Sequence, residues 1–217
     1  MRKVLEADAE NNGFKIIAWT AIGSRSVVNS KHPIKTVDDM KGLKLRCMED
    51  PILAEAINAM GAIGTPMPAS EVYTALQQGT IDGTDHTPAN VAANSWYEIC
   101  KYYSLTEHFT IPDPVFVSKA WFDRLSPENQ AALIEAGKKF ADKWNNEIWP
   151  SANEAGLKIL NEKGMEVLEV DKEQFKAKVK PFVDEFLADA TDEQKEFYDL
   201  LVNTRQKVLI MQVKAYY

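Results

Sequence analysis

The chain has 217 residues, 45% of them hydrophobic and 26% charged, so it can bury a sizeable core in one large or two small lobes. Its formal net charge of −7 argues against a protein that binds a nucleic-acid backbone, because such proteins present a basic face. No run of about 18 apolar residues occurs, so we expect no membrane span. Cys47 and Cys100 lack metal-ligand spacing, and two buried free thiols are favoured over one disulfide. We predict no metal and no cofactor.

The first half of the chain alternates strands and helices. Residues 2–11 predict a short helix, and the apolar run 14–19 predicts a strand that is buried on both faces. Thr36, with Asp39 as its capping-box partner, predicts the start of a second short helix. The elements expected next are a strand over 43–47, a helix from Pro51 to Gly61, a strand over 62–67, a helix from Ser70 to Gly79 and a strand over 80–83.

The second half continues the alternation with one long helix. The expected elements are a helix over 89–100, a strand over 102–106, a short strand within 108–119, a helix from Ser126 to about Ile148 that resumes and stops at Gly164, a strand over 165–170 and two helices started by the capping pairs Asp171/Gln174 and Thr191/Gln194. Pro150 should kink or break the long helix, and Pro181 should interrupt the helix that follows Asp171. This alternation predicts an α/β protein with a parallel or mixed sheet.

Charged side chains stand where two of these strands end. Arg46 closes one strand, and the segment Asp82 to His86 follows another. Ligands bind at the carboxyl ends of strands in open parallel sheets, and an arginine there offers a donor fork that matches a carboxylate. The competing interpretation of Arg46 is a surface salt bridge worth under about 1 kcal/mol. We favour the carboxylate contact.

The stretch that carries these residues resembles a known family. GLKLR, then TPM, then SEVYTALQQGTIDG is similar to the core of the dicarboxylate-type solute-binding proteins of TRAP transporters, and the likeness runs from about Phe14 to the final helix. It implies a two-lobed fold like that of class II periplasmic binding proteins, with a long helix that crosses between the lobes. The opening βα units of the family have no counterpart here, so the first lobe is expected to be incomplete. Residues 1–20 and 113–147 would be its remnant, and residues 21–112 and 148–217 would form the second lobe with the C-terminal helices.

The resemblance also assigns roles to single residues. It places Arg46 at the family's carboxylate-binding arginine and Arg25 at a second arginine, for which ligand contact and a purely structural role stay open. His86 stands where the family often has an asparagine that contacts the carboxylate, and Asp85 stands beside it. Ala69 replaces an aromatic residue that often faces the ligand, and a further candidate for lining that wall is Met67, with core packing as its alternative. His32 and His108 are interpreted as structural.

We therefore predict a binding module. The resemblance implies a periplasmic protein that holds a small organic acid and delivers it to TRAP membrane permease subunits, although the charged start of the chain is not a signal peptide. C4-dicarboxylates, sialic acid, uronates and keto acids all stay open as ligands. One alternative is an enzyme that uses Asp82, Asp85 and His86 as acid/base groups, which we rank lower because that pattern is short. Another is a truncated remnant that binds poorly or self-associates through its incomplete first lobe.

Overall fold

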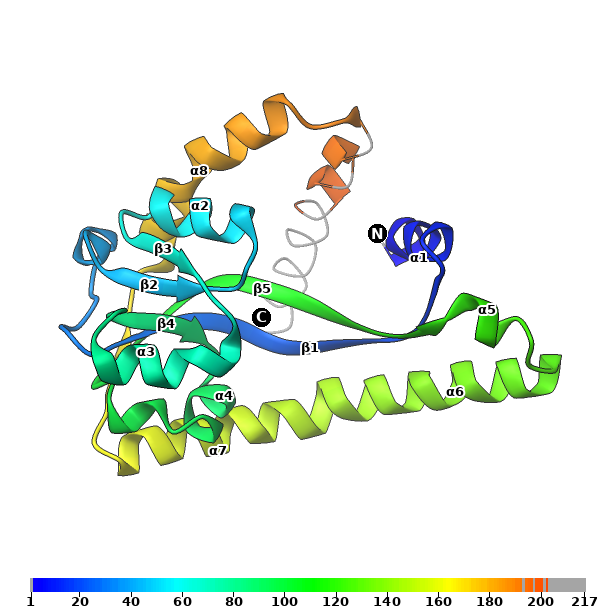
Figure 1. The fold of residues 1–217 in the computed structure, drawn as a ribbon, viewed down its shortest axis with the longest axis horizontal. Coiled ribbons are helices and arrows are strands. Elements are labelled where there is room, and N and C mark those ends of the chain that lie inside the picture. Colours follow the sequence, from blue (N-terminus) through cyan, green and yellow to red (C-terminus); the bar gives the residue numbers. More distant parts are fainter. Residues whose placement is uncertain (1, 193, 197, 201, 203–217) are drawn as a thin grey trace, which may run out of the picture.

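Two long antiparallel strands, β1 (Phe14–Asn29) and β5 (Tyr102–Ser118), pair along nearly their whole length and form the spine of the molecule (Figure 1). The computed structural model of the protein describes residues 2–192, 194–196, 198–200 and 202. The spine lies within a six-stranded mixed sheet with the strand order β3-β2-β4-β1-β5-β6. The short strands are β2 (Lys44–Cys47), β3 (Ile63–Pro66), β4 (Gly83–His86) and β6 (Glu166–Glu169).

The spine is part of the wide sheet at one end only. Residues 26–29 of β1 pair with β4, and residues 102–105 of β5 pair with β6. Beyond this region the two strands continue as a two-stranded ribbon, with register shifts between Ala21 and Ser24 and between Arg25 and Val27. β2, β3 and β4 run parallel to one another, so their carboxyl ends meet at one edge of the sheet, which faces the ribbon (Figure 1).

Helices cover both faces of the wide sheet (Figure 1). The α-helices are α1 (Arg2–Asn11), α2 (Pro51–Ala59), α3 (Val72–Gln78), α4 (Pro88–Ala93), α5 (Lys119–Phe122), α6 (Pro127–Lys143), α7 (Trp149–Glu162) and α8 (Lys172–Ala188). Short 3-10 turns occupy Val37–Met40, Ala69–Glu71 and Trp96–Glu98. Helices α2 and α8 lie on one face of the sheet, and α3, α4 and α7 lie on the other.

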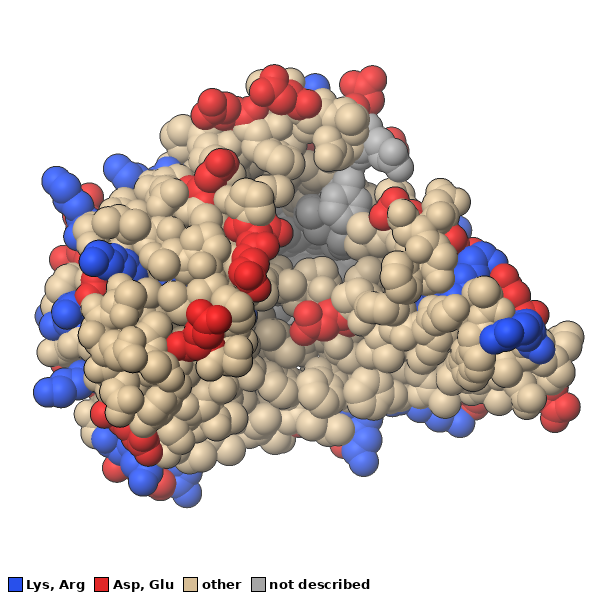
Figure 2. All heavy atoms as spheres, in the orientation of Figure 1, with Lys and Arg blue, Asp and Glu red and all other residues tan. Residues whose placement is uncertain are grey.

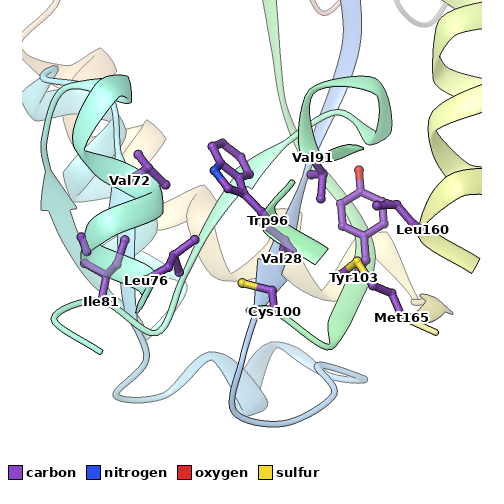
Figure 3. Close-up of a cluster of buried hydrophobic side chains, with 11 residues drawn as sticks. Val28, Val72, Leu76, Ile81, Val91, Trp96, Cys100, Tyr103, Leu160 and Met165 are labelled. Carbon is purple, nitrogen blue, oxygen red and sulfur yellow. The ribbon is translucent and has the colours of Figure 1, made fainter. Parts of the chain in front are cut away.

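Each face has its own apolar core. On the α3/α4/α7 side, Val28, Trp96 and Tyr103 point into one cluster with side chains from α3 and α7 (Figure 3). On the α2/α8 side, Val27 belongs to a second cluster that includes Leu45 and Phe175. Consecutive residues of a strand point to opposite faces, so the neighbours Val27 and Val28 serve different cores. The apolar run 14–19 does not behave in this way: it is predicted to be buried on both faces, but it lies in the part of β1 that pairs only with β5, where most of its residues are half-buried and Phe14 is exposed.

The long helix lies where the sequence predicts it, and its path does not break at Pro150, while the alternative outcome, a kink near Pro150, stays a prediction. α6 continues through a π-helical turn (Trp144–Ile148) into α7, so the helical path runs from residue 127 to 162. The amide of Trp149 bonds back to the carbonyl of Trp144, five residues earlier. A proline lacks an amide donor and clashes with the preceding turn, and a π turn is one of the local adjustments that accommodates such a disturbance. Pro181 likewise lies inside α8 and does not end it.

Several element boundaries differ from the prediction. β4 covers residues 83–86 and not 80–83, so Asp85 and His86 lie in a strand and not in the loop after it. α3 starts at Val72 after a 3-10 turn, so Ser70 is not its cap. The helix expected over 89–100 is split at Ser95, which has a positive φ of 55°. β5 extends to Ser118 because pairing with β1 outweighs its prolines.

The predicted helix starts are mostly confirmed. Asp50 caps α2 and Asp171 caps α8 through their side chains. The Thr191/Gln194 capping box has both of its hydrogen bonds. Gln174 is the exception, because its side chain accepts a hydrogen bond from the amide of Val37 and is used for tertiary contact.

The long helix covers the free edge of β1. The Asn145 side chain accepts from the amide of Ala21 at 2.9 Å and donates to the carbonyl of Trp19 at 3.1 Å. The indole of Trp144 donates to the carbonyl of Ala21. An open strand edge presents unpaired backbone groups, and here side chains of the helix satisfy them in place of another strand. The division of the chain into lobes at residues 20 and 112 stays a prediction, since β1 and β5 run through both points.

Replacement of Asn145 tests this edge. Asn145→Ala removes two hydrogen bonds and leaves backbone groups of β1 unpaired, so we expect the free energy of unfolding to fall by about 2 kcal/mol. Asn146→Ala is the matched control, because the Asn146 side chain is exposed and donates only to Asp142 within its own helix. The measurement is urea denaturation of both variants. Equal effects of the two substitutions would contradict the role of the long helix at this edge.

Candidate functional site

Arg46 lies at the carboxyl end of β2 and is almost fully buried, with 4% of its surface exposed. Its neighbours Leu45 and Cys47 belong to the α2/α8 core, so strand alternation turns Arg46 toward the opposite face. There its Nε donates to the carbonyl of Met67 at 2.9 Å, just after β3. Among the described residues Arg46 has no ion-pair partner, although burial of a guanidinium without an anion is costly.

Arg25 and Asp85 form a buried ion pair on the neighbouring strands β1 and β4. Nε of Arg25 lies 2.6 Å from Oδ2 of Asp85, and its Nη2 donates to Oδ1 at 3.0 Å and to the Asp85 carbonyl at 2.6 Å. Asp85 pairs in register with Val27 and therefore points to the α2/α8 side. Burial would raise the pKa of Asp85, but His108 and Arg25 oppose it and hold that pKa well below its usual range. Asp85 is thus a carboxylate that neutralises Arg25.

His108 joins this pair and was missed as a site neighbour by the sequence analysis. Its Nε2 lies 3.5 Å from Oδ2 of Asp85, and its Nδ1 lies 2.8 Å from Oγ1 of Thr106, which accepts from the amide of Val27. Residues 105–108 of β5 stand opposite Ser26 alone, and Glu107 has a positive φ of 45° in this bulge. The bulge turns His108 inward, and nothing in the residue spacing signals it.

His86, at the end of β4, is held as a neutral donor. Its Nδ1 accepts a hydrogen bond from the amide of Thr87 at 2.9 Å, so the neutral ring carries its proton on Nε2. Burial lowers the pKa of His86 to about 4, and the charges of Arg25 and Arg46 act in the same direction while Asp85 opposes them. The ring lies near Trp96, on the α3/α4 side. At neutral pH this residue offers an N–H and no charge.

Met67 and Ala69 follow β3. The side chain of Met67 is half-buried against the α3/α4/α7 core, and its carbonyl orients Arg46. Ala69 is exposed at the start of a 3-10 turn. Packing of Met67 against the core does not exclude that it also lines a ligand site. Contact of Met67 and Ala69 with a ligand stays a prediction.

The structure brings four of the predicted residues together, but from two faces. Arg46 and His86 point to the α3/α4/α7 side, while Arg25 and Asp85 point to the α2/α8 side. They meet at the carboxyl edge of β2 and β4. Burial is the main cause that lowers the pKa of Arg46 and the pKa of His86, and the charge of Arg25 lowers both further. Arg25 and Arg46 are buried, so the positive charge of this site is internal, and Figure 2 shows acidic side chains around the hollow in the face of the molecule that it draws.

The acid/base set proposed as an alternative is not assembled. Oδ2 of Asp82 accepts from the amide of Lys44, and Oδ1 lies 3.3 Å from the Lys31 ammonium, which places Asp82 at the start of β2. Asp85 is engaged by Arg25. In the described part of the chain, no group of three or more His, Cys, Asp or Glu residues is arranged to hold a metal ion, and no helix is long and apolar enough to cross a membrane.

Comparison with known proteins identifies the family. Residues 1–189 match the family model DctP, described as bacterial extracellular solute-binding protein, family 7. The chain belongs to this family. Among curated proteins, it is 36% identical over 183 residues to a solute-binding protein of Chromohalobacter salexigens, covering 84% of this chain and 54% of the relative. It is 40% identical over 166 residues to the 2,3-diketo-L-gulonate-binding periplasmic protein YiaO of Escherichia coli, covering 73% of this chain and 50% of that protein.

Solved structures of TRAP periplasmic solute-binding proteins share the fold. The protein from Sulfitobacter sp. NAS-14.1 with bound β-D-galacturonate has 35% identity and a TM-score of 0.84, covering 91% of this chain and 64% of that protein. The protein from C. salexigens with bound D-glucuronate has 32% identity and a TM-score of 0.86, covering 93% of this chain and 65% of that protein. The predicted family and fold class are therefore confirmed, and the family is one of transport proteins and not of enzymes. The chain spans about half the length of the curated relatives and about 64% of the solved ones.

The lowered pKa of His86 predicts a pH-dependent stability. The unfolded chain binds a proton at this position below about pH 6.5, whereas the folded protein does so only near pH 4. The unfolded state therefore binds more protons in this window, and the free energy of unfolding should fall as pH drops from 6.5 to 4, by ~3 kcal/mol at most. Urea midpoints of the wild type and of His86→Gln across this window measure the effect.

We expect a shallower pH slope in His86→Gln, because glutamine does not titrate. His32→Gln serves as the control for loss of a histidine, and it should keep the wild-type slope because His86 is intact. Identical slopes in the wild type and His86→Gln would show that another group causes the loss.

Proposed function

We propose that the chain is the periplasmic solute-binding component of a TRAP transporter. It binds an organic acid through a contact between Arg46 and the carboxylate of the acid, and it delivers the acid to a membrane permease. The observation that carries the proposal is a buried arginine without an anionic partner among the described residues, at the carboxyl edge of parallel strands. The Nε of Arg46 donates to the carbonyl of Met67, so its two Nη groups are the donors for a carboxylate.

The surroundings of Arg46 favour an anion over a neutral ligand. Arg25 adds positive charge, although most of its donors are committed to Asp85. Because Arg25 is neutralised in this way, we assign the principal carboxylate contact to Arg46 and a supporting electrostatic role to Arg25. His86 adds a neutral Nε2–H donor for a second oxygen of the ligand. The group thus suits an acid with a further oxygen near its carboxylate.

The ligands of similar proteins agree with this chemistry. The two solved structures described above hold galacturonate and glucuronate, and a third, from Bordetella bronchiseptica, at 34% identity and a TM-score of 0.81, has density assigned to pantoate. Each of these acids carries oxygen atoms close to its carboxylate. We therefore place uronates first among the candidate ligands and C4-dicarboxylates second, since the C4-dicarboxylate-binding periplasmic protein DctP of Rhodobacter capsulatus is 30% identical to this chain. The enzyme alternative is not favoured, because Asp85 is engaged in an ion pair and Asp82 lies elsewhere.

Replacement of Arg46 tests the proposal. Arg46→Ala should weaken the binding of D-glucuronate and D-galacturonate by more than tenfold, because loss of a buried bidentate partner costs about 2–5 kcal/mol. Arg46→Lys keeps the charge but loses the fork, so we expect an intermediate affinity. Isothermal titration calorimetry on the full chain is the measurement, and Arg124→Ala, on the exposed segment before α6, is the control. Micromolar binding retained in Arg46→Ala would show that the carboxylate lies elsewhere.

Self-association through the ribbon is a second, separate prediction. Phe14 and Phe116 pack edge to face at a centroid distance of 5.0 Å and remain 45% and 53% exposed. Exposed aromatic side chains on a two-stranded ribbon are a surface on which a second copy can pack. Light scattering after size exclusion should show dimers or larger species that decrease in Phe116→Ser. A monodisperse monomer at high concentration would rule this out.

A further inference from the structure

Tyr103 is fully buried, and its side chain lies on the same face of the sheet as Arg46 and His86. It pairs in register with Val28 of β1, and both belong to the α3/α4/α7 core, where Figure 3 shows the Tyr103 ring among apolar side chains. Ser26, two residues before Val28 on β1, pairs with His86 of β4, so His86 shares this face. β1 lies between β5 and β4, and the tyrosine side chain therefore extends across β1 toward the end of β4.

The Tyr103 hydroxyl donates to the backbone carbonyl of His86 at 2.9 Å. A buried tyrosine hydroxyl usually finds an acceptor, and here the acceptor is a backbone group of the candidate site. Burial raises the pKa of Tyr103 above its ordinary value, so the hydroxyl keeps its proton at neutral pH and acts as the donor. This hydrogen bond fixes the orientation of the peptide group that joins His86 to Thr87.

The same peptide group holds the imidazole of His86. Its carbonyl oxygen belongs to His86 and accepts from Tyr103, and its N–H belongs to Thr87 and donates to Nδ1 of His86 at 2.9 Å. Hydrogen bonds in such a chain polarise one another, so a donor at the carbonyl strengthens the N–H as a donor. While the peptide keeps this orientation, Nδ1 only accepts, and the proton of the neutral ring stays on Nε2. Buried Trp96 lies beside the ring, with the two centroids 6.0 Å apart, and limits the room in which the ring can turn over.

We propose that Tyr103 is a positioning residue of the Arg46 site, and that it keeps His86 a hydrogen-bond donor toward the ligand by holding the peptide group between His86 and Thr87. The inference rests on the proposed function and deepens it, because it concerns how the site is kept ready for an acid. With the proton on Nε2, His86 offers an N–H to an oxygen of the ligand. With the proton on Nδ1, Nε2 would present a lone pair to that oxygen and repel it. Tyr103 acts through His86 and not by contact with the ligand.

The first experiment observes the tautomer directly and needs no ligand. Tyr103→Phe removes the hydroxyl and keeps the ring, so the core should remain packed. Long-range proton–nitrogen NMR spectra of the full chain at neutral pH distinguish the two tautomers, and His86→Gln assigns the signals of His86. We expect the Nε2–H form in the wild type and a measurable population of the Nδ1–H form in Tyr103→Phe. Tyr73→Phe is the matched control, because it also removes a tyrosine hydroxyl bond, to Glu98 on the surface, and it should leave the signals of His86 unchanged.

The second experiment measures binding. D-glucuronate is titrated by calorimetry into the wild type, Tyr103→Phe, His86→Gln and the double variant. Loss of the hydrogen bond from His86 should weaken binding in Tyr103→Phe by about threefold to tenfold. Because Tyr103 acts through His86, Tyr103→Phe should have no further effect in the His86→Gln background, which a double-mutant cycle measures. Tyr73→Phe should bind like the wild type.

The outcomes separate this inference from the proposed function. If Tyr103→Phe keeps the wild-type tautomer of His86, the inference is overturned, and the proposed function still depends on the result for Arg46→Ala. Equal weakening by Tyr103→Phe with and without His86 also overturns the inference, because a general loss of packing acts in both backgrounds. So does a changed tautomer with unchanged affinity, since the hydroxyl would then have no effect on binding. A wild type that binds no organic acid overturns the proposed function and the inference together.

Discussion

The pairing of β1 with β5 is the interaction on which the rest of this structure depends. β1 pairs with β4 on one edge at its end, with β5 on the other edge along nearly its whole length, and with the long helix where β4 is absent. The same strand places Val27 and Val28 in two different cores. A change in the register of this strand would exchange its faces and empty both cores, so the pairing is strongly specified.

The register shifts in this pairing locate the chemistry. Between Arg25 and Val27, a bulge in β5 turns His108 toward Asp85, and the ion pair with Arg25 lies beside it. Bulges interrupt regular pairing and redirect side chains, which explains why charged residues are found inside the molecule at this point. The cost of burying Asp85 and Arg25 is offset because each satisfies the other through several hydrogen bonds.

Arg46 differs from this pair in its partner, and the proposed function rests on that difference. It is as deeply buried as Arg25, yet its described contact is with a backbone carbonyl and not with a carboxylate. A protein that pairs one buried arginine and leaves its neighbour without an anion has a stronger local preference for anions than its net charge of −7 suggests. The acidic side chains around the hollow in Figure 2 do not argue against an anion at the buried arginines. A bidentate contact between an arginine and a carboxylate acts at short range, whereas salt screens the charges on the surface.

The sequence by itself determined the family, the order of the elements and the position of Arg46, because these depend on local patterns: apolar periodicity, capping residues, and the string from GLKLR to TIDG. It also placed Asp85 and His86 near the end of a strand, whereas Arg25 was assigned to the site only through the family resemblance. The tertiary structure alone decided that Arg25 is paired with Asp85, that His108 completes the pair, and that Tyr103 donates to the carbonyl of His86. The pairing of Arg25 with Asp85 joins residues 60 positions apart, and all of these placements depend on strand register and bulges that no local pattern encodes. The same holds for Pro150, where a π-helical turn keeps the helical path continuous although local rules predict a kink or a break.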